Sequence, residues 1–283
     1  MLRFRLATAI FLGSCTIWSI FYLPTLFNSV LVSLIACLAS DEYAKILNWS
    51  GLKRSFFTGS ILVSSLAMMV LWHEKMRLIN IAYIISLWII SVSSLWWILS
   101  VPRSLLCYER GQKWSWHSEL AGWLVFSSFC ISMHILLCYY QSAGMIVFLL
   151  LVVWSSDIGA YLFGRLLGRH KLASKISPNK TIEGALAGMI SACFGGWLAF
   201  VILLNDRFIA KLTLNQVELI ALIIGAFSII GDLFESMLKR KAKVKDSGNL
   251  LPGHGGVYDR IDSLVASAPI YVLIFTFIIK IIE

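Results

Sequence analysis

The sequence contains little charge. Asp, Glu, Lys and Arg make up 14% of the 283 residues, whereas 59% are hydrophobic and the mean hydropathy is +0.82. This composition excludes an ordinary soluble domain. Internal repeats, low-complexity tracts and polar stretches of domain length are also missing from the sequence. The net charge is +9, but the basic residues sit in short segments between apolar runs, so we expect no nucleic-acid partner.

The six cysteines form no metal-ligand or redox pattern. None belongs to a CxxC pair or stands beside a histidine at ligand spacing, and five lie inside apolar runs. We therefore expect neither disulfides nor a zinc site, and we interpret the cysteines as small apolar side chains. They are Cys15, Cys37, Cys107, Cys130, Cys138 and Cys193.

Nine apolar runs are long enough, at about 17 to 25 residues, to cross a bilayer as helices. We therefore expect an all-α, polytopic integral membrane protein with about nine transmembrane helices and no large soluble domain. The first run begins like a cleaved signal peptide, but it stays apolar through Leu23, which favours an uncleaved span. The expected spans are residues 5–24, 26–47, 56–72, 78–99, 119–140, 143–164, 181–204, 216–239 and 261–282.

The polar stretch 100–118 is expected to be a loop that divides the chain. Residues 1–118 would hold the first four spans, and residues 119–283 would form a catalytic region with polar motif loops at 165–180 and 240–260. When Lys and Arg are assigned to alternate sides of the membrane, most fall on the side of these two loops. The positive-inside rule then places both loops in the cytoplasm, on a multi-pass protein of the inner (cytoplasmic) membrane.

The motif loop near the C-terminus concentrates bases, glycines and carboxylates in SMLKRKAKVKDSGNLLPGHGGVYDRID, residues 236–262. Basic side chains donate to phosphate oxygens, and glycines let the backbone approach a ligand closely. Mg²⁺ takes a few carboxylates together with substrate phosphates. A loop that is basic only because of membrane topology would explain KRKAKVK but not LPGHGGVYDRID. We interpret the segment as a metal-assisted phosphate-handling loop.

The other polar segment is WSSDIGAYLFGRLLGRHKLASKISPNKTIEG, residues 154–184. Its glycines recur near helical spacing, so one helix face could pack tightly against a neighbouring helix. SPNKT predicts a turn into a helix, with Asn179 or Thr181 near the cap and Glu183 in the first turn. A helix N-terminus beside Lys180 would be an anion site. The alternative is ordinary capping combined with topological charge.

Asp232 lies in the apolar run LIIGAFSIIGDLFES, where a carboxylate is costly unless it pairs or binds a cation. A helix would place four polar residues on one face, namely Asp232, Glu235, Ser236 and Lys239. An ion pair of Asp232 or Glu235 with Lys239 or Arg240 is therefore one interpretation. The other is a metal centre, formed if this face meets the second acidic pair, Asp259 and Asp262.

The remaining polar residues are assigned no catalytic role. Asp41 and Glu42, near the end of the second span, are interpreted as an interfacial polar patch, with contact to the active site as the less favoured alternative. Four histidines have no partner at ligand or triad spacing and are interpreted as interfacial or packing residues: His73, His117, His134 and His170.

Residues of both polar segments stand at the spacing of a known signature. The chain resembles the phosphatidate cytidylyltransferase (CDP-diacylglycerol synthase) family over roughly residues 150–283, including the Asp in the helix before SPNKT-EG and the GD of residues 231–232. The signature residues near the C-terminus are Ser236, Lys239, Arg240, Lys245, Asp246, Gly248, Pro252, His254, Gly255, Gly256, Asp259, Arg260 and Asp262.

The resemblance implies transfer of CMP from CTP to phosphatidate, giving CDP-diacylglycerol and pyrophosphate in phospholipid biosynthesis. The expected catalytic residues are Asp232, Lys239, Arg240, Lys245, Asp246, His254, Asp259 and Arg260. The expected substrate-binding residues are Asp157, Ser177, Asn179, Lys180, Thr181, Glu183, Ser236, Gly255 and Gly256. Mg²⁺ is the expected cofactor, with one or two cations left open, and its expected ligands are Asp232, Asp259 and Asp262.

The partners expected from this interpretation are CTP, phosphatidate and the lipid bilayer, and the resemblance also suggests a homodimer. Two alternatives belong to other classes. A CTP-dependent lipid kinase of the polyprenol or phytol type would transfer the γ-phosphoryl group and release CDP. A transporter of anionic solutes would use Asp157 and Asp232 to couple to cations, although the inverted repeats that favour transport are missing from the sequence.

Overall fold

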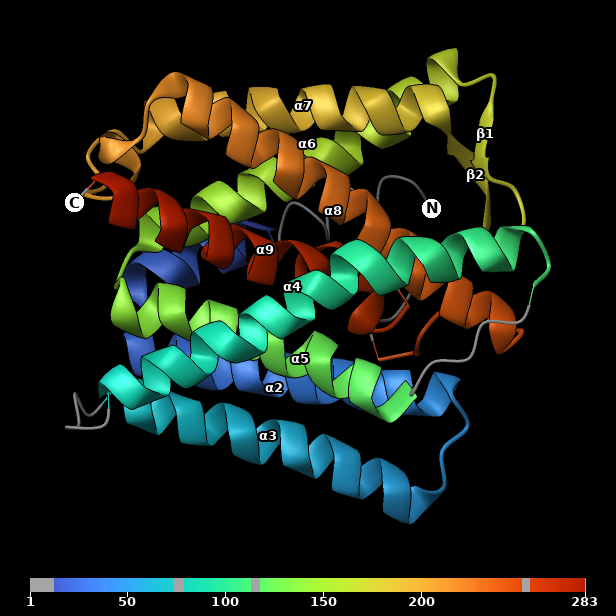
Figure 1. Ribbon diagram of the computed structural model, residues 1–283, viewed down its shortest axis with the longest axis horizontal. Coiled ribbons are helices and arrows are strands. Elements are labelled where there is room, and N and C mark those ends of the chain that lie inside the picture. The colour runs from blue at the N-terminus through green and yellow to red at the C-terminus, as the bar shows by residue number, and fades with distance from the viewer. Residues whose placement is uncertain (1–12, 74–78, 113–117, 251–254, 283) are drawn as a thin grey trace.

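The computed structural model describes residues 13–73, 79–112, 118–250 and 255–282. After a helical segment at 13–22, the helices are α2 (Thr25–Ile46), α3 (Gly51–His73), α4 (Ile79–Glu109), α5 (Ser118–His134), η1 (Ile135–Tyr139), α6 (Ala143–Leu167), α7 (Ile182–Ile202), η2 (Ile209–Lys211), α8 (Leu214–Lys241) and α9 (Tyr258–Ile282). Strands β1 (Lys171–Ala173) and β2 (Ser177–Thr181) pair antiparallel between α6 and α7 (Figure 1).

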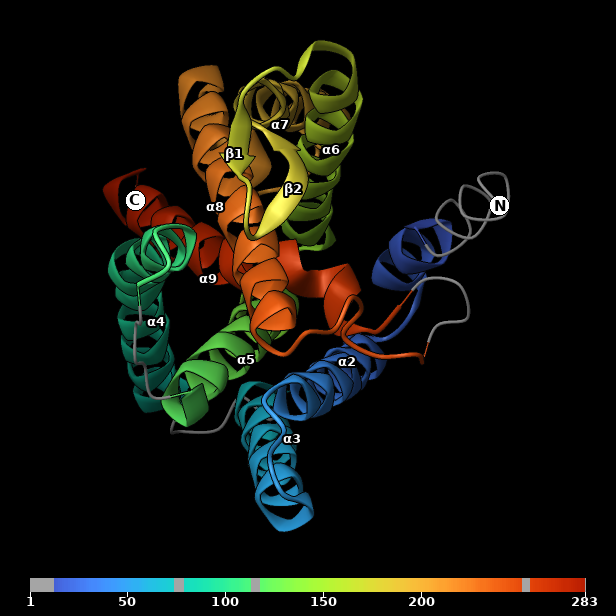
Figure 2. The same cartoon turned by 90° about the vertical axis from the view of Figure 1, so that its right-hand side faces the viewer.

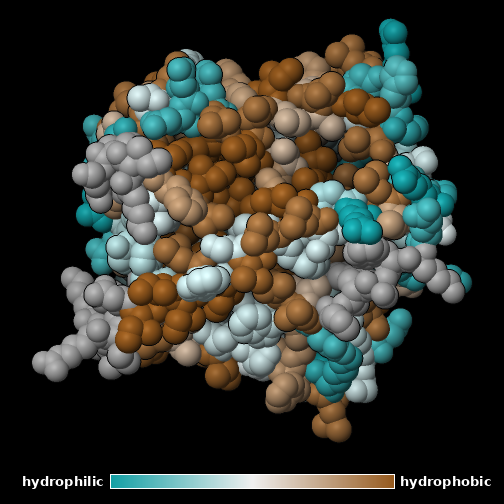
Figure 3. Space-filling view, viewed as in Figure 1, coloured by the Kyte–Doolittle hydropathy of each residue, from teal (hydrophilic) through white to brown (hydrophobic). Residues whose placement is uncertain are grey.

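Eight helices of the described residues, α2 to α9, are long and apolar enough to cross a membrane. They correspond to eight of the nine expected spans, and the described part of the first expected span, 13–22, is also helical. The expectation of an all-α membrane protein is confirmed. Apolar side chains extend across the middle of the molecule, whereas hydrophilic residues gather toward its ends (Figure 3). This distribution suits helices that traverse a hydrocarbon layer.

The expected loop 100–118 is wrong over its first half, because α4 continues to Glu109. Pro102 lies inside this helix. Proline is tolerated in membrane helices, where neighbouring helices and local adjustments satisfy the freed backbone groups. Residues 113–117 lie outside the described residues, and with them the expected interfacial His117.

Both motif loops are shorter than expected. The first, at 165–180, consists of the last turn of α6 followed by the β1–β2 hairpin. The second, at 240–260, is reduced to a connection between Lys241 and Tyr258, because α8 and α9 extend into it from both sides. Charged side chains that were expected in loops therefore lie in the last turn of α8 and the first turn of α9.

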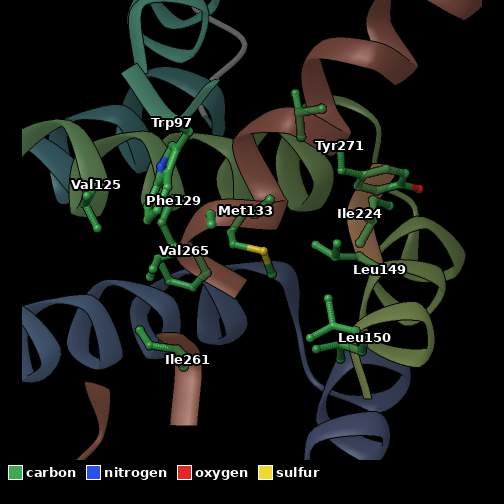
Figure 4. Close-up of a cluster of buried hydrophobic side chains, with 14 of the residues drawn as sticks. Trp97, Val125, Phe129, Met133, Leu149, Leu150, Ile224, Ile261, Val265 and Tyr271 are labelled. Atoms are coloured by element: carbon green, nitrogen blue, oxygen red, sulfur yellow. The ribbon is translucent and has the colours of Figure 1, made fainter. Parts of the chain in front are cut away.

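Helix α9 lies near the centre of the bundle when the molecule is viewed end-on (Figure 2). Helices α2, α4, α5 and α8 all contact it, and α6, α7 and α8 pack together on one side, next to the hairpin. The core around α9 is apolar and includes Trp97, Val125, Ile224, Val265 and Tyr271 (Figure 4). The hairpin, the C-terminal ends of α4, α6 and α8, and the connection into α9 lie at the same end of the molecule (Figure 1).

Helices α6 and α7 pack closely against each other, as the glycine spacing in residues 154–184 predicts. A Cβ atom at Gly184 would lie 2.8 Å from the Gly164 Cα. A Cβ atom at Gly195, farther along α7, would lie 2.7 Å from the Ser155 Cβ and 2.9 Å from the Leu151 carbonyl oxygen. The absence of side chains here lets the two backbones touch, which is how small residues join helices in a membrane.

Gly195→Ala tests this close packing. The added methyl group would force α6 and α7 apart, and overpacking of this kind costs about 1–3 kcal/mol. We expect a lower thermal unfolding temperature for the detergent-solubilised protein. Gly59→Ala in α3 is the matched control, because a Cβ atom there meets nothing within 4 Å. Equal unfolding temperatures for the two variants would contradict the packing described here.

Candidate active site

A cavity of about 790 Å³ opens at the end of the molecule that carries the hairpin. Its wall comes from α6, β1, β2, α7, α8, the connection before α9, and α9, so the two polar motifs share one site. Its charged lining consists of the acids Asp157, Asp232, Asp246, Asp259 and Asp262 and the bases Arg165, Lys171, Lys180, Lys239 and Arg260. Such a mixture can hold an anionic ligand and a cation side by side.

Lys180 of β2 and Asp232 of α8 join the two motifs directly. The Lys180 Nζ lies 2.5 Å from the Asp232 Oδ2, and both side chains are partly exposed to the cavity. The other carboxylate oxygen of Asp232 accepts a hydrogen bond from the Ser236 hydroxyl at 3.3 Å, one helical turn along α8. The expectation that Asp232 and Ser236 share a helix face is confirmed. The basic partner of Asp232 is Lys180, rather than the expected Lys239 or Arg240.

Two further carboxylates line the cavity with Asp232. They are Asp157 of α6 and Asp262 of α9, and like charges that face one cavity repel one another. Asp157 Oδ1 accepts hydrogen bonds from the hydroxyls of Ser228 at 2.9 Å and Ser263 at 3.4 Å. Lys180 pairs with Asp232 here, and a cation that entered the cavity beside these carboxylates would reduce the repulsion between them.

Lys239 is held between two carboxylates and is therefore not a loose cation of the cavity. Its Nζ lies 2.6 Å from Glu235 Oε2 and 2.6 Å from Asp259 Oδ1. Glu235 is completely buried, and the Lys239 side chain is 12% exposed. The expected ion pair between Glu235 and Lys239 is confirmed. Lys239 also links α8 to the first turn of α9 through Asp259.

Asp259 organises the connection that precedes α9. Its Oδ2 accepts hydrogen bonds from the backbone N–H of Gly256 at 2.8 Å and of Ser247 at 2.9 Å, and it lies 2.9 Å from the Ser247 Oγ. Gly255 has a φ of +79°, and a Cβ atom there would lie 2.5 Å from the same carboxylate oxygen. Glycine is needed at this position for both reasons. His254 and Pro252 lie outside the described residues.

The N-terminus of α7 has the cap that the sequence predicts. The Thr181 hydroxyl accepts a hydrogen bond from the Gly184 N–H at 3.1 Å. Glu183 turns away from the cavity and accepts hydrogen bonds from the backbone N–H groups of Arg169 and His170. The His170 Nδ1 lies 2.5 Å from the Glu183 Oε1, a contact that the sequence spacing did not indicate. Glu183 therefore fixes the link between α6 and β1.

Two further charged side chains hold the hairpin. The Arg240 Nε donates to the Ile176 carbonyl oxygen at 3.2 Å. Glu109, at the end of α4, accepts hydrogen bonds from the backbone N–H groups of Lys175 at 2.8 Å and Ile176 at 2.9 Å. These contacts set the position of β2 and hence of Lys180, the hairpin residue that pairs with Asp232.

The predicted site residues divide into two groups. The cavity lining includes nine of them: Asp157, Asn179, Lys180, Thr181, Asp232, Lys239, Asp246, Asp259 and Arg260, together with the expected metal ligand Asp262. The other described residues lie outside the lining: Ser177, Glu183, Ser236, Arg240, Lys245, Gly255 and Gly256. The roles of both groups in catalysis and binding stay predictions.

The sequence analysis assigned no site role to Arg165, Lys171 or Glu109, and it kept contact of Glu42 with the active site only as the less favoured alternative. The first two line the cavity and belong to the segment 154–184, where their proximity to Lys180 was a usable signal. The interpretation of Glu42 as an interfacial residue is wrong, because it is 5% exposed and contacts the connection before α9. Nothing in the sequence around Glu42 or Glu109 indicates these long-range contacts.

Lys239→Met tests the buried charge arrangement. The substitution leaves Glu235 buried without its cation, and breaking a buried pair in this way costs about 3–5 kcal/mol. We expect a marked fall in the thermal unfolding temperature in detergent. Lys245→Met is the control, because Lys245 is exposed on the same connection. An unchanged unfolding temperature for Lys239→Met would contradict the arrangement.

Comparison with known proteins identifies the family. Residues 3–278 match the model of the cytidylyltransferase family. A phosphatidate cytidylyltransferase of Pseudomonas aeruginosa is 30% identical over 273 residues, which is 96% of each chain. Proteins of the same name from Haemophilus influenzae and Brucella suis are 39% identical over 140 residues and 51% identical over 128 residues, covering about half of each chain. With a family match across nearly its whole length, this chain belongs to the cytidylyltransferase family.

Proposed function

We propose that this protein transfers CMP from CTP to phosphatidate, giving CDP-diacylglycerol and pyrophosphate. The observation that carries the proposal is the cavity in which bases and carboxylates from both motifs face one another at the end of a membrane-spanning bundle. The names of the relatives support the same reaction. A polar site at the membrane boundary suits a reaction between a water-soluble nucleotide and a lipid headgroup.

Four bases of the cavity serve the phosphates of the two substrates. Lys180, beside the capped N-terminus of α7, is placed to meet the triphosphate, because a helix N-terminus and a lysine both favour an anion. Arg165, Lys171 and Arg260 extend the positive lining. Both substrates are anions, so these bases reduce the repulsion between them before they can react. Lys239 contributes indirectly, because its ion pair with Asp259 fixes the position of that carboxylate.

We propose Mg²⁺ as the cofactor, held by Asp232 and Asp262 with Asp157 beside them. Within the described residues, no three acidic, His or Cys side chains form a ready-made cage for a metal ion. Mg²⁺ does not require one, since it binds through one or two carboxylates together with water and substrate phosphates. The mutual repulsion of these carboxylates also suits a cation. Bound Mg²⁺ would supply charge for the α-phosphate and the leaving pyrophosphate.

The sequence-based metal set also contains Asp259, and that assignment stays a prediction. The hydrogen bonds and the ion pair on both oxygens of Asp259 favour a different role. They make it the residue that orders the connection before α9. Asp232 and Asp262 have fewer contacts to protein donors, which favours them as the ligands.

The reaction itself needs little covalent help from the protein. An oxygen of the phosphatidate phosphate attacks the α-phosphorus of CTP, a new P–O bond forms, and the bond from the α-phosphorus to the bridging oxygen breaks with its electrons leaving on pyrophosphate. The nucleophile is already ionised, so no strong general base is required. Phosphoryl and nucleotidyl transfer depend mainly on positioning and electrostatic stabilisation, which the cavity lining supplies.

We propose that the protein lies in the inner (cytoplasmic) membrane of a bacterial cell with the cavity facing the cytoplasm. The relatives are bacterial. The excess of Lys and Arg at the end that carries the hairpin supports this orientation through the positive-inside rule. CTP is a cytoplasmic nucleotide, which agrees with it. A homodimer is proposed from the family resemblance, and light scattering of the purified protein tests it.

The direct test uses purified protein, phosphatidate in mixed micelles, Mg²⁺ and CTP labelled at either the α- or the γ-phosphate. We expect α-label in the lipid fraction and γ-label in released pyrophosphate. Lipid that carried the γ-label instead would identify a lipid kinase. If neither label entered lipid while the protein remained folded, the proposed transfer would be wrong and solute transport would be the function to test.

The roles of Asp262 and Asp259 can be distinguished by the Mg²⁺ dependence of transfer in variants of each residue. We expect Asp262→Asn to raise the Mg²⁺ concentration for half-maximal transfer by about tenfold or more, the order of effect seen even for outer-shell support of a metal. Asp259→Asn should lower kcat but leave that Mg²⁺ concentration unchanged, because it disturbs the connection and not the ligands. The reverse pattern would make Asp259 the metal ligand.

A further inference from the structure

Glu42 is a buried carboxylate in the N-terminal half of the chain, outside the two polar motif segments. It lies near the C-terminal end of α2 and is 5% exposed. Its two oxygens accept hydrogen bonds from the backbone N–H groups of Val257 at 3.0 Å and Tyr258 at 2.8 Å. These amides belong to the beginning of α9. Glu42 therefore caps this helix from a position more than 200 residues earlier in the chain.

The position of this carboxylate suits the electrostatics of a helix start. The first N–H groups of a helix have no partner within it, and a negative charge there is favoured by the helix dipole. Capping is normally supplied by a side chain just before the helix. Here the preceding residues are Gly255, Gly256 and Val257, none of which has a polar side chain. Glu42 supplies the hydrogen-bond acceptor that these residues lack.

Two glycines of the motif make room for Glu42. A Cβ atom at Gly248 would lie 2.5 Å from Glu42 Oε1, and a Cβ atom at Gly256 would lie 2.2 Å from Glu42 Oε2. Both distances are far below van der Waals contact. Part of the glycine pattern in the motif thus reflects the approach of α2, and not only the approach of a ligand.

Ser247 connects Glu42 with the active site. Its Oγ lies 2.8 Å from Glu42 Oε2 and 2.9 Å from Asp259 Oδ2. Asp259 in turn pairs with Lys239. A continuous series of contacts therefore runs from α2 through the connection before α9 to α8. The neighbouring Tyr43 adds packing, with its ring 6.2 Å from that of Tyr258.

We propose that Glu42 is a positioning residue for cytidylyl transfer. By capping α9 and holding Ser247, it sets where Asp259, Arg260 and Asp262 stand in the cavity, without touching either substrate. The proposal rests on the proposed function. It gives the N-terminal half of the chain a defined task, which is to fix the catalytic connection through one buried carboxylate.

The test compares Glu42→Gln with Asp41→Asn in the α-label assay. Asp41 is the adjacent carboxylate, and it pairs at the surface with Lys45 and Arg54 instead of with the motif. We expect Glu42→Gln to lower kcat roughly tenfold to hundredfold, the range for losing hydrogen bonds to a charged group. The KM for CTP should stay within about twofold, because the nucleotide contacts are unchanged. Asp41→Asn should retain wild-type kcat.

A second pair of variants separates positioning from folding. Gly248→Ala should lower kcat in the wild-type protein, because the new methyl group displaces the Glu42 carboxylate. In a Glu42→Ala background that carboxylate is gone, so Gly248→Ala should cause little further loss. Losses that multiply in the double variant would overturn the proposal. So would an unchanged kcat for Glu42→Gln, or a loss explained entirely by less folded protein.

The same assay distinguishes a wrong reaction from a wrong role of Glu42. If the wild-type protein and Asp41→Asn both failed to move the α-label, the proposed function would be wrong. If both moved it and Glu42→Gln did so equally well, only the role of Glu42 would be wrong.

Discussion

Compensation of carboxylate charge at one end of the bundle is the constraint on which the site depends. Asp157, Asp232, Glu235, Asp259 and Asp262 come from three membrane-spanning helices, where an uncompensated charge is costly. Two lysines divide the task, since Lys180 pairs with Asp232 while Lys239 pairs with Glu235 and Asp259. The Lys180–Asp232 pair is partly exposed to the cavity, whereas the Lys239–Glu235 pair is largely buried. Lys180 and Asp232 can therefore exchange each other for a ligand, whereas Lys239 holds α8 against the first turn of α9.

The two halves of the chain contribute differently to this site. The C-terminal helices carry the side chains that line the cavity, and the close α6–α7 contact holds the hairpin beside α8. The N-terminal helices contribute Glu42 and Glu109, which accept backbone hydrogen bonds from the connection before α9 and from the hairpin turn. A membrane enzyme must keep such polar segments ordered at the boundary of the bilayer, and long-range carboxylate caps achieve this without added protein mass.

The sequence predicted eight spans that the structure shows, offered Thr181 as one of two caps and included the Glu235–Lys239 pair among its alternatives, because hydropathy and helical spacing depend on neighbouring residues. It did not predict that Lys180 pairs with Asp232, that α4 continues through Pro102, or that Glu42 caps α9. Those features depend on tertiary contacts between segments far apart in the chain. Glu42 is the sharpest case, since a glutamate near a helix end is usually exposed and nothing local marks it as buried.

The most direct test of this account is a crystal structure with CTP and Mn²⁺, in which anomalous scattering locates the cation. The account predicts a cation on Asp232 and Asp262, with the triphosphate against Lys180 and Asp259 still bound to Lys239. A cation on Asp259 with Lys239 displaced would contradict the division of charge described here. A nucleotide bound outside the cavity between α6, α8 and α9 would contradict the site itself.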